Sequence, residues 1–212
     1  MTTMIDPKEL SDYLSGEFPD ARCSLWFRSP FECLVAVSLS AQTTDEAVNR
    51  VTPALFGAYP TPEQMGAADI EDVEAKIRSI GLYHNKARNL IALGNALQER
   101  FGGAVPHTIE ELTSLPGVGV KTASVVLIES FDIPAFPVDT HISRICKRLG
   151  YAKDGDSAEK IMSKVKRLFD EQEYKDLHHR LIAFGRSICH AKSPECEKCP
   201  FTGRCRFKAD AR

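Results

Sequence analysis

Apolar residues recur at helical spacing along almost the whole chain, and this periodicity is the strongest constraint on its fold. Residues 140–149 follow the i, i+3, i+4, i+7 pattern of one helix face, and residues 82–101 and 157–169 repeat it. Residues 31–39 are apolar almost throughout, as in a buried central helix. Because no segment shows a convincing strand pattern, the sequence predicts an all-α protein.

Start and stop signals divide the chain into about ten helices. Predicted starts are Asp6-Pro7, Ser29-Pro30, Thr61-Pro62 and the stretch from Pro137 to Thr140. Predicted ends are Gly57, Gly81, Gly102-Gly103 and Gly150. Residues 132–139 contain two prolines and form the predicted boundary between two domains.

The composition is that of a globular protein with no sign of secretion or membrane insertion. The N-terminus is acidic and polar, and no stretch approaches the length of a membrane span, so we expect a cytoplasmic protein. The net charge is -2, but residues 144–167 carry many lysines and arginines. This asymmetry fits a polyanionic partner or, equally, a solvated helix face.

The sequence LPGVG, residues 115–119, lies between predicted helices at about 108–114 and 119–130. Glycines allow a tight turn and leave backbone N–H groups open at the following helix N-terminus, which is an anion site. In a helix-hairpin-helix the anion would be a DNA phosphate, contacted without reading base sequence. The alternative is an ordinary glycine-rich connection.

Lys121 lies in the first turn of the helix that follows this hairpin. The helix dipole disfavours a cation there, and partial desolvation would also favour the neutral amine. A neutral amine is a nucleophile that forms Schiff bases. The sequence alone supports this interpretation and a simple phosphate contact equally.

Asp139 directly precedes a strongly amphipathic helix, and an N-cap role follows from that position. Hydrogen bonds from backbone N–H groups would keep the carboxylate ionised. A fixed carboxylate can also stabilise positive charge developing on a sugar, or help to take a proton from an attacking amine.

Four of the seven cysteines lie within 17 residues, with the spacing C-x6-C-x2-C-x5-C. In a reducing compartment such a group indicates a metal site. Four thiolates in one short loop suit a [4Fe–4S] cluster, and zinc is the alternative. Cys33 and Cys146 lie among apolar residues and are predicted to be core residues.

Together these motifs resemble the endonuclease III family of DNA base-excision glycosylase/lyases. The resemblance rests on the following stretches, in colinear order with the cysteine group: LSAQTTD (39–45), IGLYHNKA (80–87), LPGVGVKTA (115–123) and VDTHISR (138–144). It extends over roughly residues 25–210. One departure is Val120, where the family usually has a basic residue, so that one phosphate contact is missing.

The resemblance implies a chemistry. Lys121 attacks the deoxyribose C1′ of a damaged nucleotide, the base leaves, and the Schiff base permits β-elimination that nicks the strand 3′ to the lesion. Asp139 assists. The expected substrates are oxidised pyrimidines such as thymine glycol, and abasic sites, in double-stranded DNA.

The resemblance also assigns DNA and cofactor contacts. Gln42 fills the space left by the extruded base and Leu82 wedges the duplex open, although the residues alone would suggest a helix-end glutamine and a core leucine. The hairpin residues Leu115, Gly117, Val118 and Gly119 bind the DNA backbone. Cys189, Cys196, Cys199 and Cys205 hold a [4Fe–4S] cluster. This cluster is structural, and it orients nearby basic side chains toward phosphates: Lys192, Lys198, Arg204, Arg206 and Lys208.

The implied architecture has two lobes with a DNA groove between them, where Lys121 and Asp139 meet. We expect a six-helix barrel domain at 24–132, with the helix-hairpin-helix at about 108–130. Residues 1–23 with 133–212 then form the cluster domain, with the cluster loop at 189–205. A monomer is expected. The alternatives are a monofunctional adenine or thymine-mismatch glycosylase of the same superfamily, and a non-catalytic helix-hairpin-helix DNA-binding module.

Overall fold

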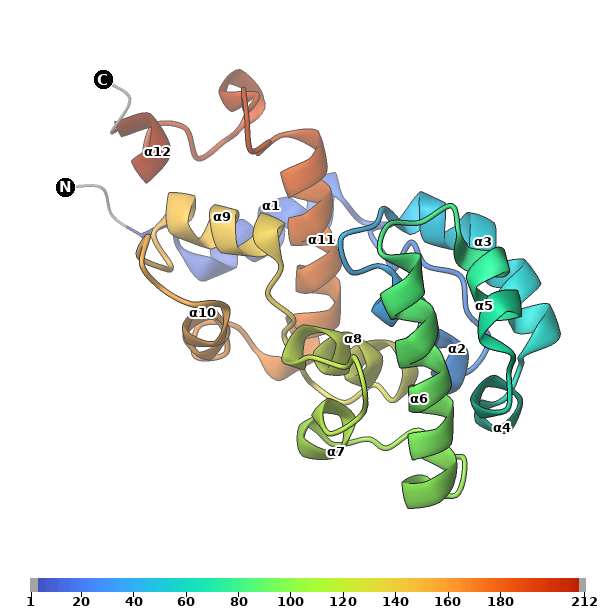
Figure 1. Cartoon of the computed structure of the whole chain (residues 1–212). Helices are drawn as coiled ribbons and strands as arrows, with labels where there is room; N and C mark the ends of the chain where they lie inside the picture. Colours follow the sequence, from blue (N-terminus) through green and yellow to red (C-terminus); the bar gives the residue numbers. More distant parts are fainter. Residues whose placement is uncertain (1–3, 210–212) are drawn as a thin grey trace. The chain divides into compact units, whose positions relative to one another are not determined.

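The computed structural model describes residues 4–209, which contain twelve α-helices, two short 3-10 helices and no strand (Figure 1). This confirms the all-α prediction. The chain forms two compact units. The hairpin unit comprises Ser24–Ile133, and the cysteine unit combines the residues up to Cys23 with those from Pro134 onward. The dividing point lies within the proline-containing stretch 132–139.

The hairpin unit is built around α2, whose side chains are buried along nearly its whole length. Its helices are α2 (Pro30–Leu39), α3 (Asp45–Ala58), α4 (Pro62–Gly66), α5 (Ile70–Ile77), α6 (Tyr83–Phe101), α7 (Ile109–Thr113) and α8 (Val120–Ser130). Cys33 on α2 is fully buried, as predicted. Helices α4 and α6 meet so closely that a Cβ on Gly94 would lie 2.5 Å from the backbone nitrogen of Gly66.

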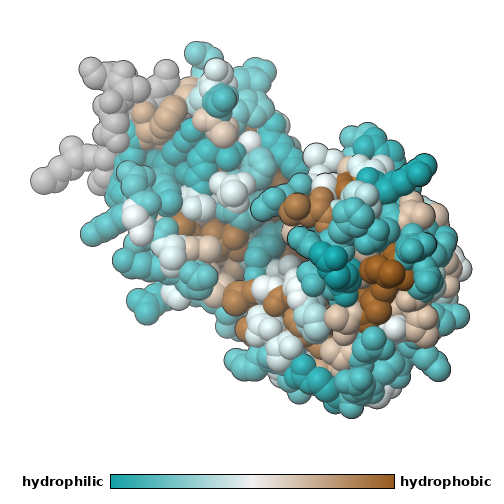
Figure 2. Space-filling view, viewed as in Figure 1, coloured by the Kyte–Doolittle hydropathy of each residue, from teal (hydrophilic) through white to brown (hydrophobic). Residues whose placement is uncertain are grey.

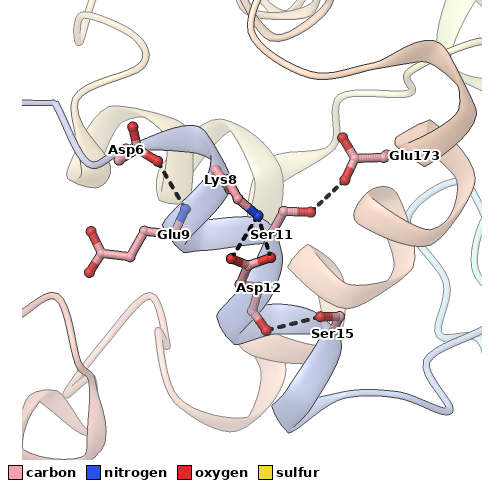
Figure 3. Close-up of polar contacts among 7 residues, drawn as sticks. All are labelled: Asp6, Lys8, Glu9, Ser11, Asp12, Ser15 and Glu173. Atoms are coloured by element: carbon pink, nitrogen blue, oxygen red, sulfur yellow. Dashed lines mark hydrogen bonds and ion pairs between the residues drawn. The ribbon is translucent and has the colours of Figure 1, made fainter.

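The cysteine unit joins both ends of the described chain around one apolar core. Its elements are α1 (Pro7–Glu17), α9 (Thr140–Leu149), α10 (Ala158–Val165), the 3-10 helix η1 (Glu171–Glu173), α11 (Tyr174–Ser187), the 3-10 helix η2 (Cys196–Lys198) and α12 (Arg206–Ala209). Leu10 and Leu14 of α1 pack in the same core as Ile142 and Phe184. Ser11 donates a hydrogen bond to Glu173, with 2.7 Å between the oxygens, which ties α1 to η1 (Figure 3).

Local signals placed most helix boundaries correctly. Asp6, Ser29, Thr61 and Asp139 each precede a helix and accept a hydrogen bond from a backbone N–H of its first turn. Gly102 and Gly150 end α6 and α9 in the left-handed conformation. Gly57 instead lies inside α3, and Gly81 lies in the turn before α6. Within residues 4–209, every helix is too short or too polar to span a bilayer.

Candidate functional site

The connection between α7 and α8 forms a tight hairpin that packs on α6. Leu115 and Val118 turn their side chains into the core, and the Val118 N–H donates to the Leu115 carbonyl over 3.2 Å. Gly117 has φ +75°, and a Cβ there would lie 3.0–3.2 Å from the side chain of Asn89. Glycine is therefore required at this position by both backbone conformation and space. Of the predicted hairpin contacts, Leu115 and Val118 have buried side chains, which leaves their backbones for any contact.

The N-terminus of α8 is left open. Gly119 occupies the N-cap position without a side-chain cap, whereas side chains cap α1 to α5, α7, α9 and α10. The N–H groups of its first turn are therefore available to an anion. Lys121 in that turn is exposed, so the partial desolvation expected from the sequence is wrong for the protein on its own. Val120 beside it is also exposed.

Gln42 and Leu82 share two unusual properties. Both are exposed, and both have positive φ, 55° at Gln42 and 60° at Leu82. A non-glycine residue in this conformation is uncommon and marks a turn held by its surroundings. The side chain of Leu82 is 58% exposed, so the core-leucine alternative is wrong.

The hairpin unit has three large exposed apolar side chains among the described residues: Trp26, Leu82 and Val120. Leu82 is itself a predicted site residue, and Val120 directly precedes Lys121. Figure 2 shows apolar side chains reaching the surface of this unit among polar ones. Exposed apolar side chains that stand singly are normal on protein surfaces, so their exposure alone assigns no partner.

Asp139 caps α9 as predicted. Its carboxylate accepts a hydrogen bond from the Ile142 N–H over 2.8 Å and remains half-buried. Beside it, Ser143 and Lys147 line the same open groove. Lys121 belongs to the hairpin unit and Asp139 to the cysteine unit, so the predicted meeting of the two stays a prediction.

The four clustered cysteines line one small apolar cavity. Cys189, Cys196, Cys199 and Cys205 all face it, together with side chains that include Phe184 and Ile188. Within residues 4–209, no three His, Cys, Asp or Glu side chains lie close enough to ligate a single metal ion. A shared apolar cavity lined by four thiols suits a polynuclear iron–sulfur group, which spreads its ligands over several irons.

Cys146 on α9 of the same unit behaves differently from the four clustered cysteines. Cys146 is buried, and burial raises the pKa of its thiol to about 12. A thiol held protonated in apolar surroundings is a packing residue, as the sequence predicted.

Two arginines on α9 contact the segment around Cys189, and sequence reasoning did not assign them. Buried Arg148 lies 3.2 Å from the Cys189 sulfur and 2.7 Å from the His190 carbonyl oxygen, and it stacks on Phe207. Arg144 donates to the Cys189 carbonyl over 2.9 Å. Their spacing of four residues on one helix face was the available signal. A buried guanidinium needs acceptors around it, and the Cys189 sulfur and the His190 carbonyl oxygen supply them.

The basic side chains around the cysteines are less available than expected. Lys198 pairs with Glu195 at 2.5 Å, and Arg204 pairs with Glu9 of α1. Both side chains stay partly exposed in these pairs, so their expected orientation toward phosphates stays a prediction. Lys192 remains exposed, and the side chain of Lys208 lies outside the described residues.

Comparison with known proteins places the chain among DNA repair enzymes. Residues 35–171 match the HhH-GPD superfamily of base excision DNA repair proteins. The chain is 46% identical to endonuclease III of Bacillus subtilis over 92% of this chain and 89% of that protein. It is 42% identical to endonuclease III of Escherichia coli K12 over 94% of each chain.

A solved structure agrees with these relatives. The structure of a trapped endonuclease III–DNA covalent intermediate, an estranged-adenine complex, is 44% identical and superposes with a TM-score of 0.93 over 98% of this chain and 99% of that one. Identity at this level over nearly the full length shows the family as well as the fold. The chain belongs to the endonuclease III family of the HhH-GPD superfamily of base excision DNA repair proteins.

Proposed function

We propose that this protein, a base-excision DNA glycosylase with AP lyase activity, removes oxidised pyrimidines such as thymine glycol and cleaves abasic sites in double-stranded DNA. Its relatives are named endonuclease III, and a similar solved structure is a covalent complex with DNA. The observation that carries the assignment of residues is exposed Lys121 in the first turn of an uncapped helix, directly after the LPGVG hairpin.

Lys121 is proposed as the nucleophile. Its neutral amine forms a bond to C1′ as the bond from C1′ to the base breaks, and the base leaves with the electron pair. The nitrogen then loses one proton, and the C1′–O4′ bond breaks as O4′ is protonated, which opens the sugar ring and leaves a protonated Schiff base between Lys121 and C1′. This Schiff base makes a C2′ proton acidic, and loss of that proton breaks the bond from C3′ to its phosphate oxygen, so that the phosphate leaves with the electron pair. Since the protein itself leaves Lys121 exposed, desolvation of the amine has to come from the bound DNA.

Asp139 is proposed to stabilise the cationic sugar and to assist proton removal from the attacking amine. The α9 N-terminus supports this role because the hydrogen bond from the Ile142 N–H holds the carboxylate in one orientation. The proposal requires Asp139 and Lys121 to act on the same damaged nucleotide.

Gln42 and Leu82 are proposed to enter the duplex, where glutamine meets the base opposite the lesion and leucine separates the stack. Their exposure and positive φ support this role. The estranged adenine named for the similar structure is the kind of unpaired base that such a glutamine would meet. The open N-terminus of α8, with Gly117 and Gly119, is proposed to hold a backbone phosphate.

Cys189, Cys196, Cys199 and Cys205 are proposed to hold the [4Fe–4S] cluster known for the family. When bound, the cluster supplies a covalent cross-link between the segment around Cys189 and the loop that follows it. Glycosyl transfer to an amine moves no net electron, so no catalytic step needs the cluster. The relatives are bacterial DNA repair enzymes, and we propose a cytoplasmic location on that ground.

Borohydride trapping tests the proposal. Reductant is added while the protein acts on a thymine-glycol duplex or an abasic duplex, and covalent protein–DNA adducts are counted on a denaturing gel. We expect an adduct with both duplexes for the wild type and none for Lys121→Ala. Trapping on the abasic duplex alone would indicate another base preference. No adduct from a folded, cluster-loaded wild type would instead indicate a monofunctional glycosylase or a DNA-binding module.

A further inference from the structure

Lys86 on α6 is the buried lysine of the hairpin unit, and its position needs an explanation. Only 8% of the residue is exposed, and its ammonium donates one hydrogen bond, to the Thr43 hydroxyl at 2.6 Å. Burial lowers the pKa of Lys86, so the charge is held there at a cost. A leucine or methionine would fill the same space without that cost.

The partner of Lys86 controls the turn that carries Gln42. The Thr43 N–H donates to the Ser40 carbonyl over 3.1 Å, and the Thr43 hydroxyl lies 3.3 Å from the Ala41 carbonyl oxygen. Because the ammonium occupies a lone pair of the hydroxyl oxygen, the hydroxyl proton is directed to Ala41. These hydrogen bonds join Thr43 to the two residues that precede Gln42, and they stabilise the turn in which Gln42 has φ 55°.

The backbone of the same lysine holds the other unusual turn. The Lys86 N–H donates to the Leu82 carbonyl over 3.0 Å, which is the first hydrogen bond of α6. The turn is anchored further by His84, whose Nδ1 lies 2.8 Å from a carboxylate oxygen of Glu74 on α5. Figure 1 shows the segment that follows α2 running beside the first turns of α6. One residue therefore contacts both turns, which lie about forty residues apart in the sequence.

We propose that Lys86 is a positioning residue that couples the Gln42 turn to the Leu82 turn, so that both side chains enter the duplex as one preformed unit. This inference rests on the proposed roles of Gln42 and Leu82. Lys86 is not proposed to contact the reacting sugar, and the protein on its own already holds both left-handed turns. Insertion then requires no rearrangement of either loop.

The test compares duplex DNA with single-stranded DNA, because a single strand offers no stack to open and no base to face. Lys86→Met keeps the apolar stem and removes the charge, while Thr43→Val keeps the shape and removes the acceptor. Thr43→Ser, which restores the hydroxyl, serves as the rescue variant. Lys76→Met on α5 is the matched control, since Lys76 pairs with Asp72 on its own helix.

The readouts are the rate of strand cleavage at an abasic site in each form of DNA, and the fluorescence of 2-aminopurine placed opposite the lesion in the duplex. We expect Lys86→Met and Thr43→Val to slow duplex cleavage about tenfold, as a displaced positioning group does, and to weaken the fluorescence rise. Single-strand cleavage should stay within about twofold, and Thr43→Ser and Lys76→Met should resemble the wild type.

Two results would overturn the inference. Equal loss on both DNA forms would mean a general structural role, and no loss on either would mean that the contact is dispensable. Gln42→Ala and Leu82→Ala, measured in parallel, test the proposed insertion roles separately from the coupling role of Lys86. If these variants also leave the duplex preference unchanged, the proposed insertion roles fail, and the inference with them. If Lys86→Met does not fold, the comparison of Thr43→Val with Thr43→Ser decides.

Discussion

The two helices whose N-termini carry the proposed catalytic residues start in opposite ways. Gly119 is the N-cap residue of helix α8 and supplies no side-chain cap, and Lys121 in the first turn is exposed. Asp139 is the N-cap residue of helix α9, and its half-buried carboxylate caps the first turn. The N-terminus of α8 therefore leaves backbone N–H groups available to an anion from outside the protein. At the N-terminus of α9, the Asp139 carboxylate already accepts a hydrogen bond from one of these N–H groups.

The difference between the two helix N-termini matches the different roles proposed for them, phosphate binding at α8 and assistance of the reaction at α9. An open helix start attracts a phosphate but gives a lysine no fixed partner, so Lys121 depends on DNA for its environment. A capped start gives up the anion site and gains a carboxylate of defined orientation and charge. Within one fold, local sequence therefore decides which helix N-terminus stays open to an anion and which one is capped by a side-chain carboxylate.

Changing the cap of α9 tests whether Asp139 is more than a cap. Asparagine caps as well as aspartate, so Asp139→Asn should keep the unfolding free energy while base release slows by about 10²- to 10⁴-fold. Asp139→Ala should lose a similar rate and also about 1 kcal/mol of stability. Urea unfolding and single-turnover glycosylase assays measure the two effects.

Ser157→Ala, which removes the cap of α10 in the same unit, is the control and should cost stability alone. Normal glycosylase rates in Asp139→Asn would show that the carboxylate is structural, and the contrast between the two helix starts would lose its chemical meaning.

Closing the open start is the reverse experiment. A Cβ at Gly119 meets nothing within 4 Å, and the backbone there is already extended, so Gly119→Asp fits without strain. The new carboxylate should occupy the N–H groups and repel phosphate, which lowers duplex affinity about tenfold, the loss expected for one charged hydrogen bond. Stability should rise by only a few tenths of a kcal/mol.

Fluorescence anisotropy with a labelled abasic duplex measures this affinity, and Gly119→Ser tests a neutral cap. Unchanged affinity in Gly119→Asp would show that DNA does not use this helix start.

Gly117 tests whether the hairpin itself needs its shape. Gly117→Ala places a Cβ at φ +75° against Asn89, and should destabilise the hairpin unit by about 1–2 kcal/mol. Gly119→Ala, in extended backbone and open space, is the matched control and should change stability much less. Thermal unfolding measured by circular dichroism compares the two variants, and equal stabilities would contradict the role assigned to the glycine conformation.

Asp156, another carboxylate of the cysteine unit, is expected to have only a structural role, and it therefore serves as a comparison for Asp139. The Lys153 N–H and the ammonium groups of Lys160 and Lys164 bind it, and they hold the pKa of Asp156 well below its usual range. A folded pKa below the unfolded one adds stability above the unfolded value, and that stability is lost as the pH falls toward the folded value.

Wild-type protein should therefore lose urea resistance as the pH falls below about 4, and Asp156→Asn should show less of this loss. Urea midpoints between pH 3 and pH 7 check this, with Asp12→Asn, an exposed partner of Lys8 on α1, as the control. Identical acid profiles for wild type and Asp156→Asn would rule out this carboxylate as a source of the acid sensitivity.

Local sequence determined the helices and most of their ends. Asp6-Pro7, Ser29-Pro30 and Asp139 start helices because each places an acceptor oxygen within reach of the next turn, and this needs only neighbours in the chain. The glycines at 102 and 150 end helices because they adopt positive φ without strain. The family motifs were also legible, and they carried the proposed roles of Lys121, Asp139 and the four clustered cysteines.

Tertiary structure decided what each of these side chains meets. The exposure of Lys121 and Leu82, the burial of Lys86 against Thr43, and the pairing of Arg204 with Glu9 all depend on residues that helical periodicity does not connect. Periodicity reports which face of a helix is apolar, whereas burial and charge pairing depend on which distant segment covers that face. The sequence determined which groups are present, and the fold alone determined which are free to act.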